Sequence, residues 1–75
     1  METHITKPNH YLKKGKWCID IIYLFVSGKS PEESYVLGNI IKYLWRYGEK
    51  NGLDDLKKAQ EYLGMLIELY QKEGK

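Results

Sequence analysis

The pattern of apolar and polar positions changes character along the chain, and each change predicts an element. Residues 1–14 have no helical apolar period, and Pro8 disfavours helix just before it, so we expect an irregular arm. The nearly continuous apolar run from Trp17 to Val26 fits either a buried strand or a buried helix. A single strand would have no partner elsewhere in the sequence. We therefore predict a helix over about residues 16–27.

The next two helices have clearer boundaries. Ser30 and Pro31 supply a capping hydroxyl and a first-turn proline, which predict a helix over about residues 31–48. The pair Asn51-Gly52 ends it, and Asp55 lies in the positive first turn of a third helix over about residues 53–72. We predict an all-α fold: residues 1–75 form one small three-helix domain, an α-hairpin with an N-terminal helix packed on it.

Helical spacing assigns faces to these segments. On the second helix, one apolar stripe is expected to face the core: Leu37, Ile40, Ile41 and Leu44. A comparable stripe on the third helix consists of Leu56, Leu63, Ile67 and Tyr70. Tyr62, Leu66 and Leu69 widen the apolar arc of the third helix beyond what one neighbouring helix needs. We interpret those three as a subunit interface, which predicts a homo-oligomer.

Size and cysteine content lead to the same expectation. A chain of 75 residues buries only about 60% of the surface that its unfolded form exposes. Cys18 is the single cysteine, and within its apolar run it is best explained as a small buried hydrophobe in a reducing compartment. The two histidines lack a ligand cluster, so we expect no metal and no cofactor. Association with copies of the same chain then remains as the way to bury more apolar surface.

Charge limits the classes of partner. The 12 basic and 10 acidic side chains leave a net charge of +2, which is too mild to predict binding to a nucleic-acid polymer. Residues 1–9 are polar, so we expect no signal peptide, and the apolar run is too short to span a bilayer. We therefore expect a cytosolic protein with no membrane partner.

Candidate binding chemistry lies on the second helix. Five polar side chains fall at helical offsets that place them opposite the core stripe: Asn39, Lys42, Tyr43, Arg46 and Lys50. Cations together with an amide and a phenol can hold phosphate oxygens and contact a base. His10 and Tyr11 in the arm and Lys58 on the third helix are placed to close over such a site. From composition alone, an ordinary solvated helix face explains the same residues.

Catalytic signatures are weak. Asp54 and Asp55 are candidate acid–base groups, but their position in the first turn of a helix also explains them as helix-stabilising charges. Trp17 is a candidate for base stacking or for packing. Gly28-Lys29-Ser30 does not form a P-loop, because Tyr23 stands where that loop requires a glycine.

Several segments are informative together: His10-Tyr11, the run from Gly38 to Arg46, Lys50, the run from Asp54 to Ala59, and Tyr62-Leu63. In combination they resemble a family of short phage proteins of formerly unknown function. The resemblance covers residues 10–67, most of the chain. That family includes a nucleotide kinase of a T-odd coliphage that lacks a P-loop, and we expect it to include tetrameric anti-CBASS sponges, which sequester cyclic nucleotide signals of host defence. The resemblance implies a nucleotide ligand.

Two functional classes follow from the resemblance: phosphoryl transfer to a nucleoside monophosphate, and sequestration of a cyclic dinucleotide without cleavage. A domain this small has little room for two nucleotides and a carboxylate-held Mg²⁺. The family commonly has an acidic residue where this chain has Trp17, and an aromatic residue there favours base stacking over catalysis. Sequestration is therefore the favoured expectation, in the cytoplasm of an infected bacterium.

The resulting hypothesis is a non-catalytic nucleotide sponge, assembled as a homo-oligomer, with a tetramer favoured. Its ligand-binding residues are expected to be His10, Tyr11, Trp17, Asn39, Lys42, Tyr43, Arg46, Lys50, Asp55 and Lys58. A third possibility is a helical adaptor that binds a host protein through Tyr62, Leu66 and Leu69.

Overall fold

The computed structural model describes residues 12–73, which form a short β-hairpin followed by three helices. The elements are β1 (Leu12–Lys13), β2 (Lys16–Trp17), α1 (Cys18–Val26), α2 (Pro31–Arg46) and α3 (Leu53–Lys72). The prediction of a mainly helical chain with three helices is confirmed.

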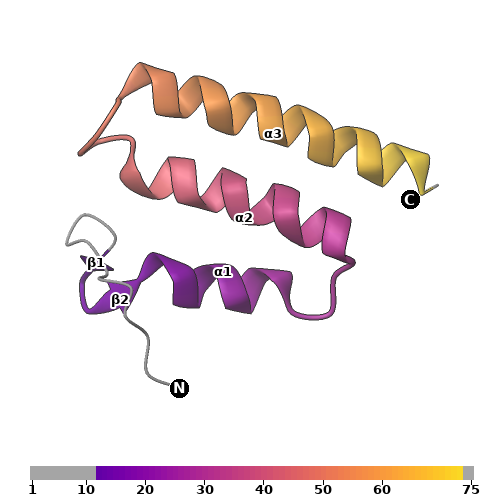
Figure 1. Ribbon diagram of the computed structural model, residues 1–75, viewed down its shortest axis with the longest axis horizontal. Coiled ribbons are helices and arrows are strands. Elements are labelled where there is room, and N and C mark those ends of the chain that lie inside the picture. Colours follow the sequence, from indigo (N-terminus) through magenta and orange to yellow (C-terminus); the bar gives the residue numbers. More distant parts are fainter. Residues whose placement is uncertain (1–11, 74–75) are drawn as a thin grey trace.

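The three helices lie side by side in one layer, with α2 between α1 and α3 (Figure 1). Each helix runs antiparallel to the next, because short loops at opposite ends of the layer join them. A domain usually needs two or more layers to enclose a hydrophobic core. Here both surfaces of the layer stay open, and the apolar side chains buried within residues 12–73 are few and small or medium-sized: Cys18, Val36, Ile40 and Ala59.

The start of α2 follows the predicted capping chemistry. The Ser30 hydroxyl oxygen accepts a hydrogen bond from the backbone N–H of Glu33 at 3.1 Å, and Pro31 occupies the first helical position. This satisfies one of the donors that a helix N-terminus leaves unpaired. The preceding helix ends before Gly28, which has a φ of +79°, a conformation that a side chain would disfavour.

The β-hairpin was not predicted. Leu12 pairs with Trp17 and Lys13 with Lys16 in an antiparallel ladder. The two connecting residues both have positive φ, +49° at Lys14 and +77° at Gly15, as a type I′ turn requires. Part of the stretch expected to be irregular is therefore paired. The first helix begins at Cys18 rather than near residue 16, because the two residues before it belong to the ladder.

Close contact between α1 and α2 occurs at Gly38. A Cβ atom built on Gly38 would lie 3.3 Å from the Cγ2 atom of Ile22, so any side chain there would push against α1. Cys18, at the start of α1, is buried as its apolar surroundings predicted. Among the helices of residues 12–73, none combines the length and sustained apolar character needed to cross a bilayer.

The packing of α3 corrects the predicted faces. The stripe expected in the core is exposed to 37–56%: Leu56, Leu63, Ile67 and Tyr70. The buried residues of α3 are Asp55 and Ala59, and their face continues at helical spacing through the half-buried side chains Tyr62, Leu66 and Leu69. The residues predicted to form a subunit interface thus lie on the face of α3 that packs on α2 of the same chain.

The second helix shows a smaller departure from prediction. Ile40 is buried and Leu37 and Ile41 are half-buried, whereas Leu44 is 48% exposed. Leu44 lies over the open surface of the layer, where it lines two shallow grooves, one beside α1 and one beside α3. It is exposed because the layer has no second layer against it.

Candidate functional site

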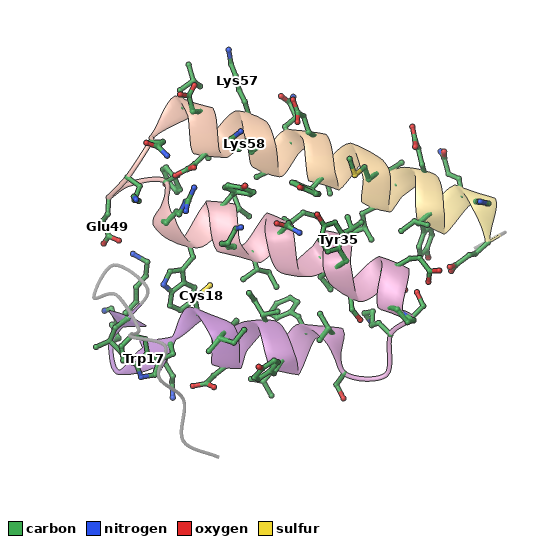
Figure 2. All side chains as sticks on the ribbon, in the orientation of Figure 1. Trp17, Cys18, Tyr35, Glu49, Lys57 and Lys58 are labelled. Carbon is green, nitrogen blue, oxygen red and sulfur yellow. The ribbon has the colours of Figure 1, made fainter. Side chains whose placement is uncertain are left out.

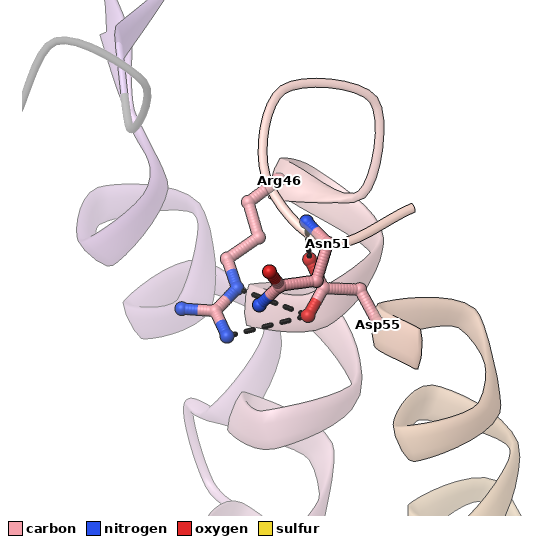
Figure 3. Close-up of polar contacts among 3 residues, drawn as sticks. All are labelled: Arg46, Asn51 and Asp55. Atoms are coloured by element: carbon pink, nitrogen blue, oxygen red, sulfur yellow. Dashed lines mark hydrogen bonds and ion pairs between the residues drawn. The ribbon is translucent and has the colours of Figure 1, made fainter. Parts of the chain in front are cut away.

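A buried ion pair joins the end of α2 to the start of α3. The Nε and Nη2 atoms of Arg46 each donate to Oδ1 of Asp55 at 3.3 Å, and the backbone N–H of Asn51 donates to Oδ2 at 3.2 Å (Figure 3). Asp55 is fully buried, and the Arg46 side chain is 17% exposed. Both carboxylate oxygens are therefore engaged inside the protein.

The environment of Asp55 contains opposing electrostatic effects. Burial raises the pKa of the Asp55 carboxyl, because it disfavours the charged form. Hydrogen bonds from Arg46 and Asn51 and the positive charge of Arg46 favour the carboxylate, and together they outweigh burial. The net pKa of Asp55 is lower than its ordinary value of 3.8, so the residue is ionised at neutral pH.

Next to this pair, three tyrosine rings meet between α2 and α3. The rings of Tyr43 and Tyr62 are stacked, with centroids 6.0 Å apart and an interplanar angle of 17°. The ring of Tyr35 meets Tyr62 edge-on, with centroids 6.1 Å apart and an angle of 72°. A hydrogen bond with Tyr35, followed by burial and nearby groups, raises the pKa of Tyr62, so this phenol stays protonated at neutral pH.

Two cations lie over the same ring. The Nζ atom of Lys42 is 4.7 Å from the centroid of Tyr43, and the guanidinium carbon of Arg46 is 5.0 Å from it. Both distances are within the range of cation–π attraction. We name this group, which consists of Tyr35, Lys42, Tyr43, Arg46 and Tyr62, the tyrosine–cation cluster.

Positive charge near the cluster is only partly neutralised. Within residues 12–73, neither Lys42 nor Lys58 takes part in an ion pair. Lys58 follows Asp55 by three residues and precedes Tyr62 by four, which places it on the cluster side of α3. Figure 2 shows the difference from its neighbour: Lys57 points away from α2, whereas Lys58 lies over α3 on the viewed side of the layer.

The charge of Lys42 also reaches the start of α1. Burial raises the pKa of the Cys18 thiol, and the positive charges of Lys42 and Lys13 lower it in part. Lys13 itself pairs with Glu49 at 3.0 Å and lies 5.9 Å from the ring centroid of Trp45. Lys13 thereby connects the hairpin to the α2–α3 loop, and both lie at the same end of the layer (Figure 1).

The structure brings together part of the predicted site. Lys42, Tyr43 and Arg46 share one face of α2, as expected, but the prediction that this face points away from the core is wrong. It packs against the first half of α3, through the Tyr43–Tyr62 stack and the Arg46–Asp55 pair. Asn39 is on the same face, where its amide donates to the backbone oxygen of Tyr35 at 2.9 Å.

The other predicted ligand contacts have different positions. Asp55 is sequestered by Arg46 and Asn51 and does not face solvent. Lys50 is exposed in the turn after α2, and Trp17 is half-buried in the hairpin, away from the α2–α3 contact. His10 and Tyr11 lie outside the described residues.

Two members of the cluster were missed or misassigned. Tyr35 had no predicted role, and Tyr62 was assigned to a subunit interface. A signal existed in the sequence: Asp55, Ala59 and Tyr62 follow the 4-3 spacing of a helix–helix seam. The signal was missed because Asp55, the first residue in that spacing, made this face of the helix appear polar.

Comparison with known proteins gives one match. Residues 5–64 match a family described as a protein of unknown function, DUF3310. The match covers more than half of the chain and includes all of the tyrosine–cation cluster. No curated protein and no solved structure matches the chain.

Proposed function

The chain belongs to the DUF3310 family, and from this membership and the geometry of the tyrosine–cation cluster we propose that it binds a nucleotide without changing it chemically. A cyclic dinucleotide is the favoured ligand. The proposed biological role is that of a phage counter-defence protein, which sequesters an immune signal in the cytoplasm of the infected bacterium. This role rests on the resemblance to phage nucleotide-binding proteins.

One observation carries the proposal: two cations lie over a single tyrosine ring that is itself stacked on a second ring. Nucleotides combine anionic phosphates with flat aromatic bases. A lysine can neutralise a phosphate as a point charge, and a tyrosine ring at the edge of a stack can receive a base. The cluster offers both chemistries close together: the Nζ atom of Lys42 lies 4.7 Å from the ring centroid of Tyr43, and the ring centroid of Tyr62 lies 6.0 Å from it.

The roles within the cluster differ. Arg46 is committed to Asp55 through two nitrogen atoms, so we assign it to holding α2 against α3 and keeping the ring of Tyr43 in place. Lys42 and Lys58 supply the charge for phosphate, because neither is paired with a carboxylate in the described part of the chain. Replacing Arg46 with alanine is therefore a test of stability rather than of ligand contact.

Binding is favoured over phosphoryl transfer by the state of Asp55. A kinase holds Mg²⁺ through carboxylates at the reacting phosphates. Asp55 is the buried carboxylate beside the cluster, and both of its oxygens already accept hydrogen bonds from the protein. Phosphoryl transfer is the alternative, because the resemblance includes a phage nucleotide kinase, and a reaction set with ATP and Mg²⁺ tests it.

The proposed assembly is a homo-oligomer, with a tetramer favoured by the resemblance to sponge proteins. In such an assembly His10, Tyr11, Trp17 and Lys50 would close over ligand held at the cluster of the same or a neighbouring subunit. Asn39 would contact base or ribose through its amide oxygen or its second N–H, because one N–H donates to the backbone oxygen of Tyr35. These contacts are part of the proposal.

The test is calorimetric titration of the purified protein with cyclic dinucleotides, cyclic trinucleotides and nucleoside monophosphates, followed by chromatographic recovery of each ligand. A parallel set contains ATP and Mg²⁺. Tight binding of a cyclic nucleotide that is recovered intact supports the proposal. Phosphorylated monophosphate in the parallel set would replace it with the kinase alternative. If none of the ligands binds, the proposal is wrong and the cluster serves only to pack α2 on α3.

Matched variants locate the site. Lys42→Gln and Lys58→Gln each remove one charge from the cluster side, and we expect affinity to fall roughly tenfold for each. Lys29→Gln removes the same charge from an exposed residue in the loop between α1 and α2, and it should leave affinity unchanged. Equal losses in the Lys29 and Lys58 variants would mean that the ligand responds to net charge rather than to this site.

A further inference from the structure

Within residues 12–73, one stripe on α3 is largely exposed. Leu56, Gln60, Leu63, Ile67 and Tyr70 follow one another at spacings of 4, 3, 4 and 3 residues. This is the spacing of a seam between two paired helices. The stripe lies beside the face that packs on α2, so α3 carries two parallel stripes with this spacing. Among the described residues, only one of the two packs along another helix.

We propose that the occupant of this outer stripe is the α3 helix of a second copy of the chain, in antiparallel orientation about a two-fold axis near Leu63. In a two-fold interface, a contact between one residue of the first copy and another residue of the second occurs twice with the copies exchanged, so the surface must be complementary to itself. The stripe meets this requirement in its apolar residues, its charges and its shape. The inference does not depend on the proposed nucleotide ligand.

Apolar complementarity comes from the ends of the stripe. With the axis near Leu63, Tyr70 of one copy comes opposite Leu56 of the other, because each is seven residues from Leu63. Leu56 and Leu63 line a groove of roughly 450 Å³ between α2 and α3. A tyrosine is the kind of large amphipathic side chain that anchors an interface by entering such a groove.

Charge complementarity selects the orientation. Lys57 and Glu68 are eleven residues apart, close to three helical turns, so they lie on the same flank of the stripe. Antiparallel pairing brings Lys57 of one copy next to Glu68 of the other, six residues before the axis and five after it. Parallel pairing would instead place the two copies of this flank on opposite sides of the seam, so Lys57 of one copy would not meet Glu68 of the other.

Gly64 gives an independent reason for a close neighbour. A glycine inside a helix weakens it relative to alanine, so its presence there calls for an explanation. A Cβ atom on Gly64 would meet nothing within 4 Å among residues 12–73, so no contact in that part of the chain requires the glycine. Gly64 adjoins Leu63 on the flank that carries Lys57, where a small residue lets a second helix approach.

The exposed apolar face of α1 is the competing surface. Tyr23 is 63% exposed and Leu24 is 74% exposed. That helix has nine residues, however, and Asp20 stands in the same outward face. The 20-residue α3 offers a longer seam with ordered spacing, and it is therefore the surface to which we assign the second copy.

The experiment is sedimentation equilibrium of the full chain from about 1 to 100 µM, with circular dichroism to verify helix content. We expect wild type to have a multiple of the 8.9 kDa chain mass, and Leu63→Glu to halve that mass or raise the dissociation constant on the order of a hundredfold. Leu24→Glu, the matched control on α1, should leave the mass unchanged. A monomeric wild type, or dissociation by Leu24→Glu and not by Leu63→Glu, would overturn the proposal.

Charge reversal tests the orientation with an intact apolar seam, and it remains decisive if Leu63→Glu loses helix content. Lys57→Glu and Glu68→Lys should each weaken association by roughly tenfold, because each creates two like-charge contacts. The double variant restores opposite charges in the antiparallel arrangement and should recover most of the affinity. If neither single variant weakens association, or if the two losses simply add, the antiparallel pairing is wrong.

Discussion

Arg46 and Asp55 are nine residues apart in sequence, and their side chains meet across the loop that joins α2 to α3. The guanidinium donates to one carboxylate oxygen, and the loop residue Asn51 donates its backbone N–H to the other. One buried carboxylate thus fixes the end of one helix, the start of the next and the loop between them. The same arginine is in contact with the ring of Tyr43, so this clamp also sets the geometry of the candidate site.

Replacing Arg46 with alanine should destabilise the protein strongly, because it leaves the Asp55 carboxylate buried without its main partner. We expect the melting temperature to fall by roughly 10 °C or more. Arg46→Lys should be intermediate, since one ammonium keeps the charge but not the two-nitrogen geometry. Thermal melts by circular dichroism measure this, with Lys50→Ala as an exposed control. Wild-type stability of Arg46→Ala would contradict the clamp.

The same pair predicts a pH dependence. The folded state holds the pKa of Asp55 below 3.8, the ordinary value that the unfolded chain retains. The unfolded state therefore binds a proton at higher pH than the folded state does. The stabilisation is complete above about pH 5 and is lost as the pH falls through 3.8 toward the lowered pKa. Urea titrations between pH 3 and pH 7 should show this loss in wild type and a smaller one in Asp55→Asn.

Gly38 predicts a steric limit on the packing of α1. A valine at this position would press against Ile22, whose Cγ2 atom would already be 3.3 Å from the added Cβ. We expect Gly38→Val to cost about 1–3 kcal/mol of unfolding free energy. In an Ile22→Ala background the same substitution should cost clearly less, because the opposing methyl group is gone. Equal costs in both backgrounds, measured by urea denaturation, would place the strain elsewhere.

Cys18 should react slowly in the native protein. It is 3% exposed, and burial raises the pKa of its thiol above 9.0. Both effects lower the rate of reaction with an aromatic disulfide reagent at pH 8, because the thiolate is the reactive form. We expect labelling to be about a hundredfold slower in buffer than in strong denaturant. Fast native labelling would mean that α1 separates readily from α2.

Local signals in the sequence were sufficient to predict that the chain forms three helices. The serine cap at Ser30 was readable and is present as a 3.1 Å hydrogen bond. The hairpin was missed because its signal is only two residues, Lys14 and Gly15, between strands of two residues each. A turn with positive φ at a lysine has no strong signature in the sequence.

The faces of α3 could not be assigned from hydrophobicity. Two adjacent stripes have the same 4-3 spacing, and the more apolar one was expected to pack inside. The structure buries the other, because Ala59 is small enough for α2 to approach and Asp55 finds a partner in Arg46. A buried carboxylate is tolerated only with such a partner, and the partner could not be identified before the two helices were placed together. The same limitation hid the role of Tyr62 beside Tyr43.

The single layer of helices also has a kinetic consequence. The main packing contacts join α1 to α2 and α2 to α3, so each helix finds its partner in the next segment of the chain. Folding then closes only short loops, and proteins with such local contacts fold in microseconds to milliseconds. The layer can also open from its edge, with α1 separating while α2 and α3 stay paired through Arg46 and Asp55. Native-state amide exchange would accordingly be faster in α1 than at the α2–α3 seam.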